Sequence, residues 1–341
     1  MQSDITRQVS ASVYQDAPLR EKIFNFAKDS YHAVVDTFGL NSIEVLKHVL
    51  NARREERNYN QRLFLPAIML WVIIFMILAS AGEALEESSS VFSAFVVFCI
   101  AYRIVILRDI NQRDFLKNNL SKDSYNSNFH YDKSNSYLIS HFHNRIGGNA
   151  VFYSGFSPFV GSGLDIGGWS FVIDIDKGKK IMDRKFSPSS FEEAELYSAI
   201  SQEIDDLKIQ TLSIYDKVFI NGNKIRNNRE LLPNILGHPV NNVSREYIEL
   251  VMNNDIKDAR FYKVIQVVDW EGDLVLSAFF RLQKNEKSLF IENNYFLLPP
   301  IGDNLKAIDR TKEHSGIRYF IGWIVGLFVS LRRRPSCEVS I

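Results

Sequence analysis

The chain has 341 residues, of which 46% are hydrophobic, and its 40 basic and 40 acidic side chains give a formal net charge of zero. This balance argues against a nucleic-acid partner, because phosphate binding needs a surplus of Lys and Arg on one face. The two cysteines, Cys99 and Cys337, cannot build a disulfide framework or a cysteine-based metal site. We therefore expect no nucleic acid, no metal and no cofactor.

Residues 1–62 are predicted to form an N-terminal helical region on the cytoplasmic side. The stretch up to about residue 15 is expected to be loosely ordered. Apolar side chains then recur at three- and four-residue steps over residues 19–38, which indicates a helix that ends at Gly39. Asn41 and Glu44 have the spacing of an N-cap pair, so a second helix is expected to begin there.

The run 63–107 predicts a hairpin of two transmembrane helices. Residues 63–81 contain no charge and approach the roughly 20 apolar residues that a span requires. Residues 88–107 carry one charge, Arg103, which is close enough to the helix end to reach lipid headgroups. The connecting loop 82–87 is acidic and the outer flanks are basic. The positive-inside rule then places both flanks in the cytoplasm of a multi-pass protein of the bacterial inner (plasma) membrane.

Residues 108–146 are predicted to form a charged helix followed by a polar linker. His141 and His143 lie two residues apart in this region, and His130 is near them in sequence. No Cys, Asp or Glu stands at ligand spacing, so the pattern does not indicate a metal site.

Residues 147–310 predict a cytosolic α+β domain with a largely antiparallel sheet. Aromatic and β-branched residues indicate strands at 150–153 and 169–175. A capping box beginning at Ser190 predicts a helix to about residue 208. Three apolar runs between residues 260 and 298 predict an antiparallel meander.

A glycine-rich loop, residues 155–168, is the candidate binding site of this domain. Its backbone N–H groups could meet a small anionic ligand, as in phosphate-binding loops, although it matches neither a dinucleotide fingerprint nor a Walker loop. The alternative is a structural turn whose Phe156, Phe159 and Val160 plug the domain. The candidate ligand-binding residues are Gly161, Ser162, Gly163, Asp165, Gly167 and Gly168.

Residues 311–341 are predicted to form an apolar, membrane-associated helix and a basic tail. The apolar segment 317–331 is short for a span, and both of its flanks are basic. Gly322, Gly326 and Ser330 recur every four residues, a spacing that lets membrane helices approach closely. We favour a helix in the membrane plane, packed on the hairpin, over a third full span.

Three stretches carry a resemblance to other proteins: Val151–Gly163 with Trp169–Phe171, residues 33–39 and residues 45–53. Together they resemble a group of uncharacterised bacterial membrane proteins with N-terminal helices, a membrane hairpin and a cytosolic domain that carries a Pro158-Phe-Val-Gly-Ser-Gly163 loop. The resemblance implies this architecture and no particular activity.

Two functions are consistent with these predictions. The first is a non-enzymatic membrane protein whose cytosolic domain senses a ligand or partner and acts through the membrane helices, as membrane-disrupting effectors of antiviral defence do. The alternative is a membrane-tethered enzyme with its site in the loop 155–168. The first is favoured because no catalytic motif is present. The expected partners are the lipid bilayer and, in a homo-oligomer, further copies of the chain.

Overall fold

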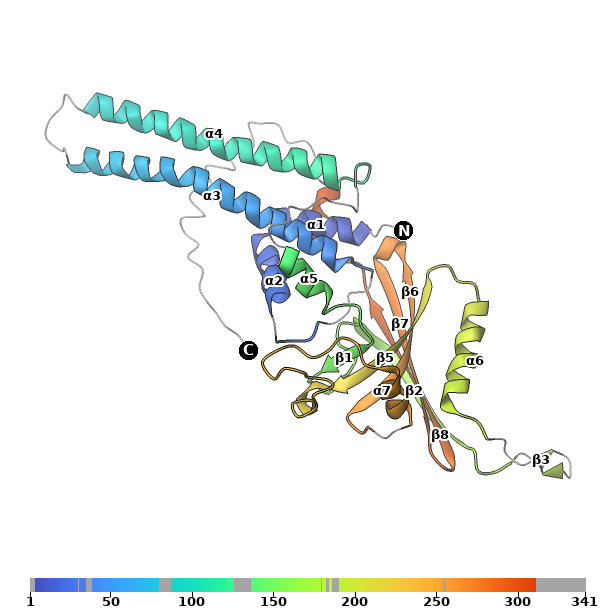
Figure 1. The fold of residues 1–341 in the computed structure, drawn as a ribbon. Helices are drawn as coiled ribbons and strands as arrows, with labels where there is room; N and C mark the ends of the chain where they lie inside the picture. The colour runs from blue at the N-terminus through green and yellow to red at the C-terminus, as the bar shows by residue number, and fades with distance from the viewer. Residues whose placement is uncertain are drawn as a thin grey trace.

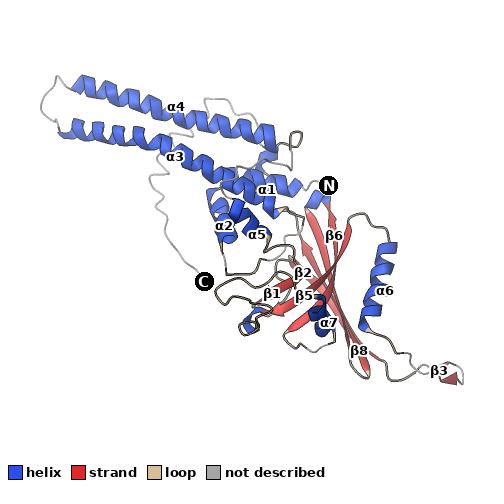
Figure 2. Ribbon diagram, in the orientation of Figure 1, coloured by secondary structure: helices blue, strands red, loops and turns tan. Residues whose placement is uncertain are grey.

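The computed structural model describes residues 4–29, 31–34, 39–79, 87–125, 136–178, 180–181, 184–185, 190–253 and 256–310. Helices make up the first part of the described chain, and most of the strands lie in the second (Figure 1, Figure 2). We name α1 to α5 the helical module and residues 147–310 the sheet module. The helices of the helical module are α1 Asp4–Gln15, α2 Ala17–Lys28, α3 Ser42–Ala79, α4 Glu87–Leu120 and α5 Ser136–His143.

The helical module is built on the antiparallel pair α3 and α4. In Figure 1 these two helices lie side by side and extend away from the sheet. Their inner ends pack on α1, because apolar side chains of the three helices share one core: Ile5, Val9, Val13, Val45, Val49, Leu116 and Leu120. α2 begins after Asp16, whose side chain accepts a hydrogen bond from the Leu19 N–H.

Two N-terminal predictions are corrected and one is confirmed. Residues up to 15 are not loosely ordered, because α1 is a buried helix from Asp4. The helix predicted over 19–38 is α2, which ends at Lys28, while residues 35–38 lie outside the described residues. The cap at Asn41 is confirmed, since its side chain accepts from the Glu44 N–H at 3.2 Å.

The predicted transmembrane hairpin is wrong on this structure. Within the described ranges, no helix combines the length and the apolar character that crossing a membrane requires. Of the first run, 63–81, the structure describes residues 63–79 as part of α3, and residues 80 and 81 lie outside the described residues. In the second, Arg103 interrupts the apolar part of α4. The predictions of a membrane fold class and of a multi-pass inner-membrane location are corrected accordingly.

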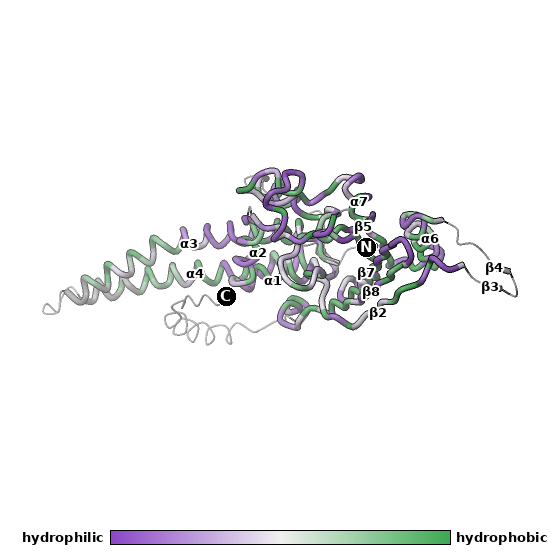
Figure 3. Tube along the Cα trace, turned by 90° about the horizontal axis from the view of Figure 1, so that it is seen from below, coloured by the Kyte–Doolittle hydropathy of each residue, from purple (hydrophilic) through white to green (hydrophobic). Residues whose placement is uncertain are grey.

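The hairpin nevertheless carries many exposed apolar side chains. Figure 3 shows that hydrophobic residues fill the outer parts of α3 and α4 and hydrophilic residues the parts nearer the sheet. The exposed set includes Phe64, Trp71, Phe75, Phe92 and Phe95. Residues 82–86 of the acidic loop and the whole segment 311–341, with Gly322, Gly326 and Ser330, lie outside the described residues, and Glu87 begins α4.

The sheet module contains a mixed six-stranded sheet in the order β1-β5-β6-β7-β8-β2. β1 and β5 run parallel, and each other neighbouring pair is antiparallel. The meander predicted between residues 260 and 298 is confirmed as β6, β7 and β8. The strands are β1 Ala150–Tyr153, β2 Leu164–Asp174, β5 Leu212–Asn221, β6 Ala259–Asp269, β7 Leu274–Lys284 and β8 Ser288–Leu298.

The two faces of this sheet carry different cores. One face packs under α6 Glu193–Asp206 and α7 Arg245–Met252, with Tyr197, Val218, Tyr247 and Leu282 among its buried residues. The other face holds an aromatic cluster: Phe219, Tyr262, Phe279 and Phe296. The helix predicted from Ser190 is α6, but its capping box is formed by Glu192 and Glu195 instead.

Short elements complete the described chain. β3 Lys180–Ile181 and β4 Arg184–Lys185 form a small separate hairpin sheet. The 3-10 helices are η2 Gly222–Lys224, η3 Trp270–Gly272 between β6 and β7, and η4 Ala307–Arg310 after β8. η3 and η4 lie against the helical module, where they position the site described next.

Candidate functional site

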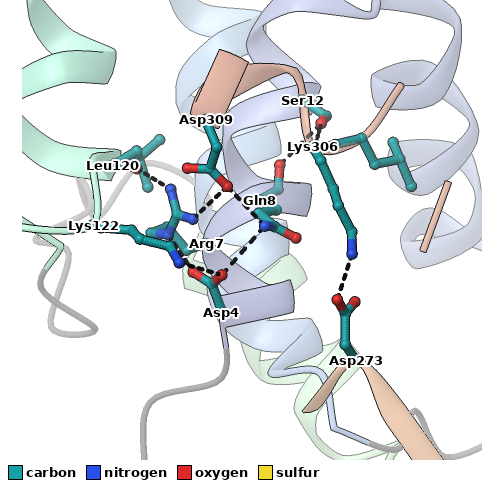
Figure 4. Close-up of polar contacts among 10 residues, drawn as sticks. Asp4, Arg7, Gln8, Ser12, Leu120, Lys122, Asp273, Lys306 and Asp309 are labelled. Carbon is teal, nitrogen blue, oxygen red and sulfur yellow. Dashed lines mark hydrogen bonds and ion pairs between the residues drawn. The ribbon is translucent and has the colours of Figure 1, made fainter. Parts of the chain in front are cut away.

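Polar side chains from four separate parts of the chain meet where the helical and sheet modules touch (Figure 4). α1 supplies several of them, the end of α4 supplies a carbonyl and a nearby lysine, and the turns after β6 and β8 supply the rest. We call this set the polar junction: Asp4, Arg7, Gln8, Ser12, Leu120, Lys122, Asp273, Lys306 and Asp309.

Arg7 is the centre of the polar junction. Its side chain is buried, and each side of its guanidinium reaches a different element. Nε donates to Asp4 Oδ1 at 2.6 Å, Nη1 donates to the Leu120 carbonyl at 3.0 Å, and Nη2 donates to Asp309 Oδ2 at 2.8 Å. One planar group therefore fixes α1 to the end of α4 and to η4, which suits the fork geometry of arginine.

Gln8 and Ser12 extend the same contact along α1. Gln8 Nε2 donates to Asp309 Oδ2 at 2.8 Å and to Asp4 Oδ2 at 3.2 Å. Ser12 Oγ lies 2.9 Å from the carbonyl oxygen of Leu305. The chain that leaves β8 is thus held against α1 at successive turns of the helix.

A second ion pair joins the two turns of the sheet module. Lys306 Nζ contacts Asp273, which follows η3, and both side chains are largely shielded from solvent. η3 in turn touches the loop before α3: a Cβ on Gly39 would lie 3.1 Å from the Gly272 carbonyl oxygen. Both glycines have positive φ, 70° and 97°, so this close approach needs glycine.

The charges of the polar junction stabilise one another. Burial by itself lowers the pKa of Arg7, but its bonds to Asp309 and Asp4 outweigh burial and raise that pKa. Burial likewise raises the pKa of Asp309, but the bonds from Arg7 and Gln8 outweigh it and lower the pKa below its ordinary value. Removing Asp309 would leave the buried guanidinium of Arg7 with Asp4 as its remaining carboxylate partner and without the hydrogen-bond acceptor of its Nη2.

A cavity of about 330 Å³ lies between α1, α2, α3 and α4. Arg20 forms an ion pair with Glu56 across it, and the Arg108 guanidinium lies 4.1 Å from the centre of the Tyr59 ring. The other lining residues include Tyr14, Glu55, Arg62 and Gln112. The arrangement could hold a small polar molecule in contact with four helices.

Tyr14 connects the cavity to the buried side of α3. Its hydroxyl lies 3.2 Å from His48 Nδ1 and accepts from Asn51 Nδ2 at 3.0 Å. Burial raises the pKa of Tyr14, while burial, helped by Lys47, lowers the pKa of His48 to about 4. A neutral His48 shares a hydrogen bond between Nδ1 and the Tyr14 hydroxyl, with the direction set by the tautomer of the ring, and the pair acts as a hydrogen-bonded part of the core.

The glycine-rich loop is organised around Phe159. Its ring lies 4.5 Å from that of Phe279 and 5.0 Å from that of Phe296, inside the aromatic cluster. Phe156, by contrast, is fully exposed, and Val160 is exposed too. The interpretation of the loop as a structural turn that plugs the domain therefore holds for Phe159, but not for Phe156 or Val160.

The candidate ligand residues of this loop fall into two groups. Gly161, Ser162 and Gly163 precede β2, whereas Asp165, Gly167 and Gly168 belong to it. A Cβ at Gly163 would lie 2.3 Å from the Leu297 carbonyl oxygen and one at Gly168 2.5 Å from that of Asn293. Strand pairing therefore explains these two glycines, and the anionic-ligand role of the loop stays a prediction.

The histidines singled out in the sequence lie apart from this junction. His141 and His143 belong to the helix α5 rather than a strand, and the His141 ring lies 5.6 Å from that of His238. His130 lies outside the described residues. In the described ranges, no three His, Cys, Asp or Glu side chains are grouped so that they could hold a metal ion.

Comparison with known proteins finds one match. A family model described as an AbeC-like domain matches residues 168–335, just under half of the chain. This region is similar to an AbeC-like domain. It hints at a defence-related role. Neither a curated protein nor a solved structure matches the chain.

The AbeC-like region does not coincide with the whole polar junction. It contains Asp273, Lys306 and Asp309, whereas Arg7 and Leu120 come from the preceding helices. It also begins after the Pro158–Gly163 loop, so the match does not cover that part of the resemblance to bacterial membrane proteins. The junction therefore joins the AbeC-like region to the part of the chain outside it.

Proposed function

We propose that this chain is a non-enzymatic antiviral defence protein in which the sheet module responds to a ligand or partner and the helical module carries the response. The AbeC-like match supports the defence role. The polar junction supports separate roles for the two modules, because Asp309, which follows β8, accepts hydrogen bonds from both Arg7 and Gln8 of α1. This shared carboxylate is the observation on which the proposal rests.

The coupling has a physical basis in the burial of Arg7. A shift of η4 that withdrew Asp309 would remove a charge partner and a hydrogen-bond acceptor from a buried guanidinium. Arg7 also holds the Leu120 carbonyl, so its rearrangement would reach the end of α4 directly. A signal that favours one position of η4 would then favour one arrangement of the α3–α4 hairpin.

The signal in this proposal is a small anionic ligand or a protein partner. Its candidate binding place in the sheet module is the glycine-rich loop, residues 155–168, whose backbone N–H groups could meet an anionic ligand. The enzymatic alternative receives no comparable support, because Phe159 fills the space beneath the glycine-rich loop.

The experiment is a phage challenge of bacteria that express the chain. We expect the wild type to lower plaque counts for at least one phage of a broad panel, and Asp309→Asn to lose this protection at equal protein levels. The matched control is Asp206→Asn, which makes the same change at an exposed position of α6. No protection by the wild type would contradict the defence role, and full protection by Asp309→Asn would contradict the coupling.

A further inference from the structure

β2 is an edge strand that the described part of the chain leaves open. It is the last strand of the sheet and pairs on one side only, with β8. All eleven of its residues, Leu164–Asp174, are exposed. An edge of this length presents a row of unpaired backbone groups that can pair with a further strand.

The side chains of β2 make this edge unusual for a protein surface. Its central stretch, from Ile166 to Ile173, contains no charged residue and no proline. Trp169 and Phe171 stack on one face, with ring centres 5.2 Å apart, and Val172 is exposed on the other. Natural edges are usually protected by charges, prolines or bulges, and here the bulge lies near the start of the strand, between Asp165 and Gly167.

The direction of the backbone groups follows from one hydrogen bond. The Ile175 N–H donates to the Lys287 carbonyl at 2.9 Å, so Ile175 points its backbone groups toward β8. Backbone groups alternate along a strand, hence those of Phe171 also point toward β8 and those of Ser170 and Val172 point away from it. The outward groups therefore belong to Gly168, Ser170, Val172 and Asp174.

We propose that β2 pairs with β2 of a second copy of this chain, antiparallel and about a two-fold axis at Ser170. This register places Trp169 of each copy opposite Phe171 of the other, an aromatic cross-strand pairing that stabilises sheets. It places Asp174 opposite Ile166, so no two acidic residues face each other. A second copy fits this edge because the same uncharged strand supplies both rows of donors and acceptors, as an isologous contact requires.

The proposal predicts a dimer of modest affinity with one continuous sheet. Pairing along a single strand buries less surface than the roughly 800 Å² per partner of a standard interface. Dimerisation is therefore expected to depend on concentration. This inference is independent of the defence role and of the polar junction, which lies at a different part of the sheet module.

The test is sedimentation velocity of the full chain over a concentration series, combined with hydrogen exchange of β2. We expect a concentration-dependent dimer in which the amides of Ser170 and Val172 gain protection on association, while that of Phe171 is protected in both states. Val172→Lys and Ser170→Pro should abolish the dimer. The proline removes an outward N–H and leaves the β2–β8 ladder in place. Circular dichroism checks the folding of both variants.

Leu236→Lys is the matched control, because it introduces the same charge at a highly exposed leucine in a loop outside β2. This variant should dimerise like the wild type. A wild type that stays monomeric at every concentration would overturn the proposal. So would dimers that persist in Val172→Lys, or association without protection of the outward amides, since either result would place the contact elsewhere.

Discussion

At the scale of residues, buried polar groups define the interior of the helical module. Arg7, Gln8, Ser10 and His48 are all buried there among apolar side chains. Their positions are set by specific partners, such as Asp309 for Arg7 and the Tyr14 hydroxyl for His48. Apolar periodicity in a sequence does not identify buried polar side chains. For this reason the sequence predicts a loosely ordered stretch up to about residue 15, where the structure has the helix α1.

His48 leads to a prediction about pH and stability. Its pKa is lowered from its ordinary value of 6.5 to about 4, first by burial and then by Lys47. Between these two values the unfolded chain takes up a proton that the folded chain does not, so this group's stabilising contribution is present above pH 6.5 and is lost as the pH falls. The slope approaches about 1.4 kcal/mol per pH unit.

Urea unfolding from neutral pH to pH 4 measures this effect. Other groups also titrate in this range, so the quantity to compare is the difference in slope between the wild type and His48→Gln, which removes the titrating ring. We expect the variant to lose stability less steeply as the pH falls. Equal slopes in the two proteins would mean that His48 titrates normally in the folded state.

At the scale of elements, a strand could be predicted where apolar and polar residues alternate, or where apolar residues follow one another, over the length of a strand. β6, β7 and β8 follow from their aromatic and β-branched runs and the Glu271-Gly-Asp273 turn. The two apolar runs predicted as membrane spans, 63–81 and 88–107, fall on the longer helices α3 and α4, and within the described ranges neither helix meets the requirements of a membrane span. The role of Phe159 was one of two alternatives, and only the structure places its ring in the aromatic cluster.

The glycine-rich loop provides a matched pair of variants. Phe159→Ala should destabilise the sheet module by roughly 3 kcal/mol, because its ring contacts four aromatic side chains of the core. Phe156→Ala changes a fully exposed phenylalanine of the same loop and should change stability by less than about 0.5 kcal/mol. Chemical denaturation of both variants checks this, and equal losses would show that Phe159 does not anchor the loop.

At the scale of the whole molecule, the polar junction joins the helical module to the sheet module. Arg7 and Asp309 are 302 positions apart, and no local pattern marks either residue as a partner of the other. The candidate site could therefore not be predicted from one sequence, in contrast to the meander or to the cap at Asn41. The sequence does indicate a helical part and a sheet part. Only the fold shows where these two parts are in contact.

Hydrogen exchange of Asp309→Asn, compared with the wild type and with Asp206→Asn, tests the central claim most directly. If the junction couples the modules, the loss of one charge on η4 should speed exchange in α1 and in the last turns of α4 as well as in η4 itself, since Arg7 bonds all three. Asp206→Asn should leave these segments unchanged. Faster exchange confined to residues 302–310, with α1 and α4 protected as in the wild type, would contradict the claim.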